Sequence, residues 1–151
     1  MTRTDTLHAS CVLVGEAGVL IRGASGAGKS RLALDLLEAA RARGLHARLV
    51  GDDRIRLAAA HGRLVARPHP AIAGLVERRG VGILERPHAP AAIVRLVVDL
   101  VPEYPPRLPD PEALEAEILR VRLPRLVSSA HDGIATIALD ALRGLSVGTP
   151  R

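Results

Sequence analysis

Residues 23–30 read GASGAGKS and are typical of a phosphate-binding loop. They fit the pattern G-x-x-x-x-G-K-[ST] at every fixed position. Glycines let successive backbone N–H groups converge on phosphate oxygens, and the N-terminus of a following helix adds positive potential. Lys29 is the only lysine in the chain, since every other Lys-or-Arg position is arginine. The pattern predicts a P-loop, and the alternative is a plain glycine-rich turn between a strand and a helix.

Within this loop Lys29 can neutralise the outer phosphates as a compact charge, and Ser30 can offer its hydroxyl to Mg²⁺. The expected nucleotide-binding residues are Gly23, Ala24, Ser25, Gly26, Ala27, Gly28, Lys29 and Ser30.

Two neighbouring carboxylates, Asp52 and Asp53, follow the apolar run RLVG. Carboxylates at the end of a strand beside a P-loop can bind Mg²⁺ or orient a nucleophile. Successive side chains of an extended chain point to opposite sides, so these two can divide the roles. The alternative is a solvated turn after a strand, which Asp also favours.

The elements around these residues should bring them together. Residues 11–15 and 18–23 predict a hairpin, and residues 29–43 predict a helix with Gly44 as its C-cap. The apolar stripe of that helix is Leu32, Leu36, Leu37 and Ala40. Residues 47–51 predict the buried strand that ends in the two carboxylates.

The rest of the chain predicts one α/β domain, a mixed β-sheet flanked by helices. It spans residues 1–151 with a core of about 7–144. The expected elements are a hairpin around His61-Gly62, a strand and then a glycine-rich segment in 71–85, a central strand in 91–101, a proline-rich loop in 102–111, a short helix in 112–119 and a strand in 120–126. A last helix is expected to be capped by Ser129 and to end at Gly144. Its apolar stripe would be Ile134, Ile137, Ala138, Ala141 and Leu142.

The composition argues against a membrane-spanning, a disulfide-bonded and a nucleic-acid-binding protein. The chain has 151 residues and no apolar run of the roughly 20 residues that a membrane helix needs. Its single cysteine, Cys11, excludes an internal disulfide and is expected to be a buried small hydrophobe, which fits a cytoplasmic protein. The net charge is +5, but the arginines are dispersed and Phe and Trp are absent, so nucleic-acid binding is not expected. A basic surface could instead steer an acidic protein partner.

Four segments, in this order, resemble the catalytic domain of HPr kinase/phosphorylase. They are LHAS (7–10), GVLIRGASGAGKS (18–30), LVGDD (49–53) and ERRGVGI (77–83). The pattern E-x-R-G-x-G-I is met by Glu77, Arg79, Gly80, Gly82 and Ile83. The resemblance covers roughly residues 7–144 and lacks the N-terminal domain of longer members. It implies an ATP- and Mg²⁺-dependent kinase that phosphorylates a serine of HPr, the phosphocarrier protein of the sugar phosphotransferase system.

The resemblance also implies roles for matching residues. His8 resembles the catalytic histidine, Lys29 the phosphate-binding lysine, and Asp53 the proton acceptor in phosphorylation. Ser30 and Glu77 correspond to magnesium ligands, with Asp52 as a further candidate. Arg107, in the proline-rich loop, is expected to be the active-site arginine. The family also forms hexamers, which implies a homo-oligomer.

Two departures from the family pattern bear on function. Arg31 stands where longer members usually have Glu, and residues 121–129, VRLPRLVSS, replace a basic segment tied to dephosphorylation. The second departure predicts weak phosphorylase activity. A small-molecule kinase and a slow nucleotide-binding switch stay open as alternative functions.

Overall fold

The computed structural model describes residues 3–103 and 110–148. The strands are β1 (Arg3–Leu7), β2 (Ala9–Val14), β3 (Ala17–Gly23), β4 (Ala47–Gly51), β5 (Ile55–Ala60), β6 (Arg63–Pro68), β7 (Leu75–Arg78), β8 (Gly82–Glu85), β9 (Ala92–Leu100), β10 (Glu115–Ile118) and β11 (Val121–Ser128). The helices are α1 (Lys29–Ala42) and α2 (Ile134–Gly148), with short 3-10 turns at Pro70–Ile72 and Pro111–Leu114.

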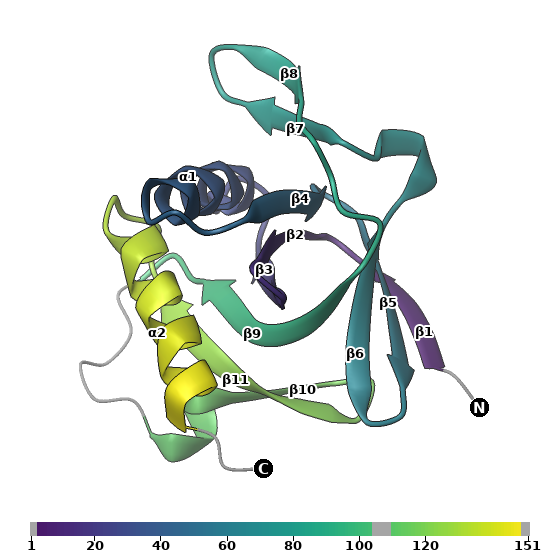
Figure 1. The fold of residues 1–151 in the computed structure, drawn as a ribbon, viewed down its shortest axis with the longest axis vertical. Coiled ribbons are helices and arrows are strands. Elements are labelled where there is room, and N and C mark those ends of the chain that lie inside the picture. Colours follow the sequence, from purple (N-terminus) through teal and green to yellow (C-terminus); the bar gives the residue numbers. More distant parts are fainter. Residues whose placement is uncertain (1–2, 104–109, 149–151) are drawn as a thin grey trace.

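The main sheet is mixed, as the sequence predicts. Its order is β1-β5-β6-β9-β3-β2-β4, and the β10–β11 hairpin joins it through β11 beside β9. The central pairs β3–β9 and β9–β11 are parallel, whereas the other pairs are antiparallel. Figure 1 shows α1 and α2 side by side against the sheet, and the β7–β8 hairpin standing apart from it. A mixed sheet flanked by helices is therefore confirmed.

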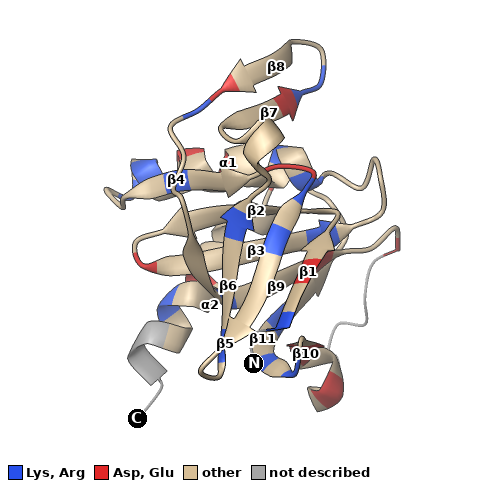
Figure 2. Ribbon diagram, turned by 90° about the vertical axis from the view of Figure 1, so that its right-hand side faces the viewer, with Lys and Arg blue, Asp and Glu red and all other residues tan. Residues whose placement is uncertain are grey.

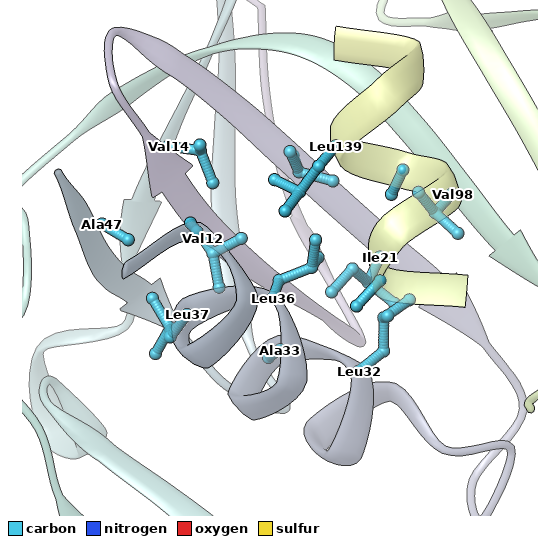
Figure 3. Packing of buried hydrophobic residues seen from close by; sticks show 14 of the residues in the cluster. Val12, Val14, Ile21, Leu32, Ala33, Leu36, Leu37, Ala47, Val98 and Leu139 are labelled. Carbon is cyan, nitrogen blue, oxygen red and sulfur yellow. The ribbon is translucent and has the colours of Figure 1, made fainter. Parts of the chain in front are cut away.

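Two apolar clusters cover the two faces of the sheet because strand residues alternate in direction. Ile21 of β3 belongs to the cluster under the helices, whereas its neighbour Leu20 belongs to the cluster under β5 and β6. Figure 3 shows Leu36 of α1 facing Leu139 of α2, whereas Leu32 lies beside Ile21 of β3. The predicted stripe of α1 is buried in full, since each of its four residues is at most 2% exposed.

Most predicted elements are confirmed close to their expected bounds. These are the hairpin of β2 and β3, helix α1 with Gly44 at a positive φ after its end, the hairpin of β5 and β6, and the strands β4, β9 and β11. Cys11 is fully buried, and burial raises the pKa of its thiol to about 12. No helix in the described ranges is long and apolar enough to span a membrane.

Four predictions near the C-terminus were wrong. Residues 112–119 form a 3-10 turn and strand β10, because pairing with β11 outweighs the helix propensity of Glu, Ala and Leu. Ser129 does not cap the last helix, which begins five residues later at Ile134, and Gly144 lies inside that helix. Ile137 is 44% exposed, so it is not part of the buried stripe.

Two further strands were not predicted. The glycine-rich segment of 71–85 contains β8, which pairs with β7 to form a hairpin. Strand β1 pairs with β5 at the edge of the sheet, and its polar residues are exposed, which is why hydrophobic patterning misses it.

Candidate functional site

The loop between β3 and α1 has the backbone that a phosphate site needs. Gly26 and Gly28 have φ values of 81° and 102°, which side chains other than hydrogen rarely allow. A Cβ on Gly28 would also lie 3.1 Å from the Ala130 Cβ. Within the described residues, nothing accepts a hydrogen bond from the amides of Gly26, Gly28, Lys29 or Ser30. These free N–H groups at a helix N-terminus can receive phosphate oxygens.

Lys29 lies against the loop that it would serve. Its Nζ donates to the carbonyl oxygens of Gly23 at 2.8 Å and Ala24 at 3.0 Å. The ammonium is thus held at the mouth of the loop by two neutral acceptors, with its full charge available to an anion. This position fits the predicted role of a point charge on the outer phosphates.

Asp52 is a buried hub that joins three elements. It is 4% exposed, and its Oδ1 accepts hydrogen bonds from the hydroxyls of Ser10 at 2.5 Å and Ser30 at 2.8 Å. Its Oδ2 accepts from Ser30 at 2.9 Å and from the backbone N–H of Glu77 at 3.3 Å. One carboxylate therefore ties β2, the start of α1 and β7 together at the end of β4.

Asp53 points the other way, into solvent. It has a positive φ of 67°, and its side chain is 66% exposed. Its Oδ1 lies 3.6 Å from the Nδ1 of His8, which is 75% exposed. The structure thus brings together two candidate catalytic residues that are 45 positions apart in the numbering. The two carboxylates point in different directions, as the sequence predicts, but the cause is the turn at Asp53 and not the alternation of side chains along an extended strand.

Ser30, Asp52 and Glu77 offer the hard oxygen donors that Mg²⁺ prefers. The hydroxyl of Ser30 touches Asp52, and the backbone of Glu77 touches the same carboxylate. The described residues hold no cluster of three or more His, Cys, Asp or Glu that could bind a metal by itself. These residues fit Mg²⁺ all the same, because this ion is usually held by one or two carboxylates together with substrate phosphates and water.

The β7–β8 hairpin presents the E-x-R-G-x-G-I segment. Glu77 pairs with Ile83 across the hairpin, and Gly80 and Gly82 take positive φ values at the turn. Figure 2 shows this hairpin projecting beyond the main sheet, with acidic and basic residues on it. In the same view the basic residues are spread over several strands.

Arg31 does not leave a free positive charge beside the P-loop. It forms ion pairs with Asp132 and, at 3.7 Å, with Asp35 of the same helix. Burial raises the pKa of Asp35, and the charge of Arg31 opposes that rise. Arg107 lies outside the described residues.

The sequence analysis did not predict the ion pairs that Asp99 of β9 makes with its neighbouring strands β3 and β11. Arg22, next to Gly23, makes a two-pronged pair with Asp99 at 2.7 and 2.8 Å, and Arg125 of β11 adds a third bond at 2.5 Å. Burial by itself would raise the pKa of Asp99, but the two guanidinium groups hold it below its usual range. Two features of the sequence could have indicated these buried polar contacts and that of Ser10 with Asp52. They are the acid inside the apolar run AAIVRLVVDLV and Ser10 inside LHAS.

A model of the HPr Serine kinase C-terminal domain matches residues 1–89, more than half of the chain. The chain belongs to this family. The matched residues include the P-loop, both carboxylates and the β7–β8 hairpin. The resemblance seen in the sequence is therefore confirmed.

Relatives and a solved structure agree with this family. The chain is 42% identical over 79 residues to an HPr kinase/phosphorylase of Mycoplasma mycoides subsp. mycoides and 38% identical over 79 residues to one of Clostridium beijerinckii. Each match covers 52% of this chain, but 23% and 24% of those proteins, so the chain spans about a quarter of their length. The Hpr(Ser) kinase/phosphatase from Coxiella burnetii is 27% identical with a TM-score of 0.74, over 94% of this chain and 99% of that one.

Proposed function

We propose that this domain is an ATP- and Mg²⁺-dependent protein serine kinase that phosphorylates HPr and so regulates carbohydrate metabolism. The observation that supports it best is the exposed Asp53–His8 pair beside the P-loop. A base that faces solvent can be reached by a serine on the surface of another protein. Family membership, and the printed names of the relatives, make HPr the substrate to test first.

The chain's own residues would divide the work as follows. The free amides of the P-loop and the ammonium of Lys29 bind and neutralise the phosphates of ATP. Asp53 accepts the proton of the serine hydroxyl as its oxygen attacks the γ-phosphorus, and ADP leaves. His8, whose Nδ1 lies 3.6 Å from the Oδ1 of Asp53, is proposed to orient Asp53. Arg107 is proposed to contact the transferring group.

Ser30 and Glu77 would hold Mg²⁺, which would neutralise charge on the phosphates. Asp52 is buried and already accepts bonds from three donors. We therefore propose that Asp52 orients Ser30 and Glu77 and would balance part of the positive charge of the metal.

A small-molecule kinase needs an enclosed acceptor pocket. The side chains of Asp53 and His8, the candidate groups on the acceptor side, are 66% and 75% exposed, which favours an open surface for a protein substrate. A nucleotide-binding switch has little use for a base beside the γ-phosphate, so the Asp53–His8 pair also favours the kinase.

The test is transfer of labelled phosphate from ATP to purified HPr, beside HPr in which the target serine is alanine. We expect label on the first protein only, and none without Mg²⁺. The matched variant is Asp53→Asn, which keeps shape and should bind ATP but transfer no phosphate. Transfer by Asp53→Asn at the wild-type rate would remove Asp53 from the mechanism, and ATP hydrolysis with no labelled HPr would favour the switch.

We also propose a homo-oligomer, a hexamer by family resemblance, located in the cytoplasm. Light scattering on the purified chain tests the assembly. A monomer at working concentration would contradict it.

A further inference from the structure

A cavity lies at the opposite end of the β3–α1 unit from the P-loop. It measures about 650 Å³ and is bordered by the β2–β3 turn, the end of α1, β9 and α2. This volume is within the usual range of small-molecule sites, about 300–1,000 Å³. Helix α1 has 14 residues, so about 20 Å separate the two ends of the unit. The cavity is therefore distinct from the candidate active site.

The lining is apolar with a cationic rim. Leu139 forms part of the floor, Leu45 is 42% exposed at the edge, and Arg43, Arg95 and Arg143 contribute guanidinium groups. Glu16 is the one acidic residue among those that line it.

The arginines differ in their partners. Arg43 is paired with Asp140 at 3.1 Å. In the described part of the chain, no carboxylate lies within ion-pair distance of Arg95 or Arg143. Two cationic groups beside an apolar floor therefore have no ion-pair partner among the described residues.

Arg95 is placed by an irregularity in the sheet. On β3, Gly18 pairs with Val94 and Val19 pairs with Leu96, so Arg95 is the extra residue of a bulge in β9. Bulges often re-aim a side chain at a functional position. Arg95 is half-buried and lies in the lining of the cavity.

We propose that this cavity binds a free organic anion that has an apolar body and a carboxylate or phosphate group. The apolar part lies on Leu139 and Leu45, and Arg95 and Arg143 hold the anionic group. Two guanidinium groups with five donors each suit such a head group. The site does not depend on the proposed kinase activity.

Sodium octanoate is a suitable probe, observed through the leucine methyl signals in NMR. We expect saturable shifts of Leu139 and Leu45 and none of Leu32, near the P-loop. Octanol, without the charge, and acetate, without the apolar body, should each bind at least tenfold more weakly. MgATP should not displace octanoate, because the two sites are separate.

Charge-removing variants complete the test. Arg95→Gln/Arg143→Gln should weaken octanoate binding at least tenfold, whereas Arg56→Gln, at an exposed residue of β5, should leave it unchanged. Equal binding of octanol and octanoate, or wild-type affinity in the double variant, would overturn the proposal. Sedimentation with phosphatidylglycerol vesicles that requires Arg95 and Arg143 would also overturn it, because the anion would then be a lipid headgroup.

Discussion

Replacing Asp52 should destabilise the fold, whereas replacing its neighbour Asp53 should not. Asp52→Ala removes the acceptor of the fully buried Ser10 hydroxyl, of Ser30 and of the Glu77 amide. A buried donor without a partner costs about 1–3 kcal/mol. Ser10 has no access to water, whereas Ser30 is partly exposed and the bond to Glu77 is long. We therefore expect a loss of about 2–4 kcal/mol in the free energy of unfolding.

Two milder variants serve as controls. Asp52→Asn should cost less, about 1 kcal/mol, because the amide can keep its oxygen toward Glu77 while the serine hydroxyls turn to accept from its nitrogen. Asp53→Asn should lie within about 0.5 kcal/mol of wild type, since Asn tolerates a positive φ and exposed ion pairs contribute little.

Unfolding is best followed by far-UV circular dichroism, because the chain has no Trp and one Tyr. For a chain of this length the expected loss in Asp52→Ala lowers Tm by about 4–16 °C. If the Asp52→Ala variant were as stable as the wild type, the hydrogen bonds of Asp52 would not stabilise the fold and the reasoning would be refuted. An Asp53→Asn variant less stable than Asp52→Ala would show that the two roles are assigned the wrong way round.

Four further predictions concern the site and its supports. Lys29→Ala and Lys29→Arg should both lose phosphate transfer with circular dichroism unchanged, because a planar guanidinium does not replace a compact charge; full activity of the Arg variant would contradict this. Glu77→Gln should lower activity and recover partly at high Mg²⁺, and a loss indifferent to Mg²⁺ would indicate a structural role instead. Because Arg22 and Arg125 lower the pKa of Asp99, the ionised Asp99 stabilises the folded protein fully above the usual pKa of 3.8, and this stabilisation is lost as pH falls through the pKa of the folded state. The Asp99→Asn variant should thus be about 2–3 kcal/mol less stable than the wild type at pH 7, and urea titrations at pH 2–3 should show a smaller difference. Pyrophosphate release from serine-phosphorylated HPr and inorganic phosphate should be much slower than the forward kinase, and equal rates would show that residues 121–129 support phosphorolysis.

Local features of the site were predictable from the sequence. The P-loop, helix α1 and the strand before Asp52 each depend on neighbouring residues, so spacing and periodicity suffice. The contacts that complete the site are not local. Ser10 and Asp52 are 42 positions apart, and Arg22 and Asp99 are 77 apart, so which buried polar groups meet depends on the strand order.

Two of the wrong predictions relied on local preference alone. Residues 112–119 are rich in helix formers, yet β10 gains hydrogen bonds from β11 that a short isolated helix cannot match. Ser129 is a good capping residue, but its buried hydroxyl has no partner among the described residues. Tertiary pairing outweighs local preference in β10, and the capping preference of Ser129 is not enough to start a helix there.

The different surroundings of the two carboxylates suit an enzyme that acts on a protein surface. A base that meets another protein must be exposed, but a mobile base loses the advantage of fixed geometry. Here Asp53 is exposed and follows a residue that is fixed by three donors. The carbonyl of Asp52 also accepts a hydrogen bond from the Arg54 amide at 2.8 Å, which closes the turn around Asp53. The buried carboxylate therefore holds the backbone of the exposed one, which is the arrangement that the proposed base needs.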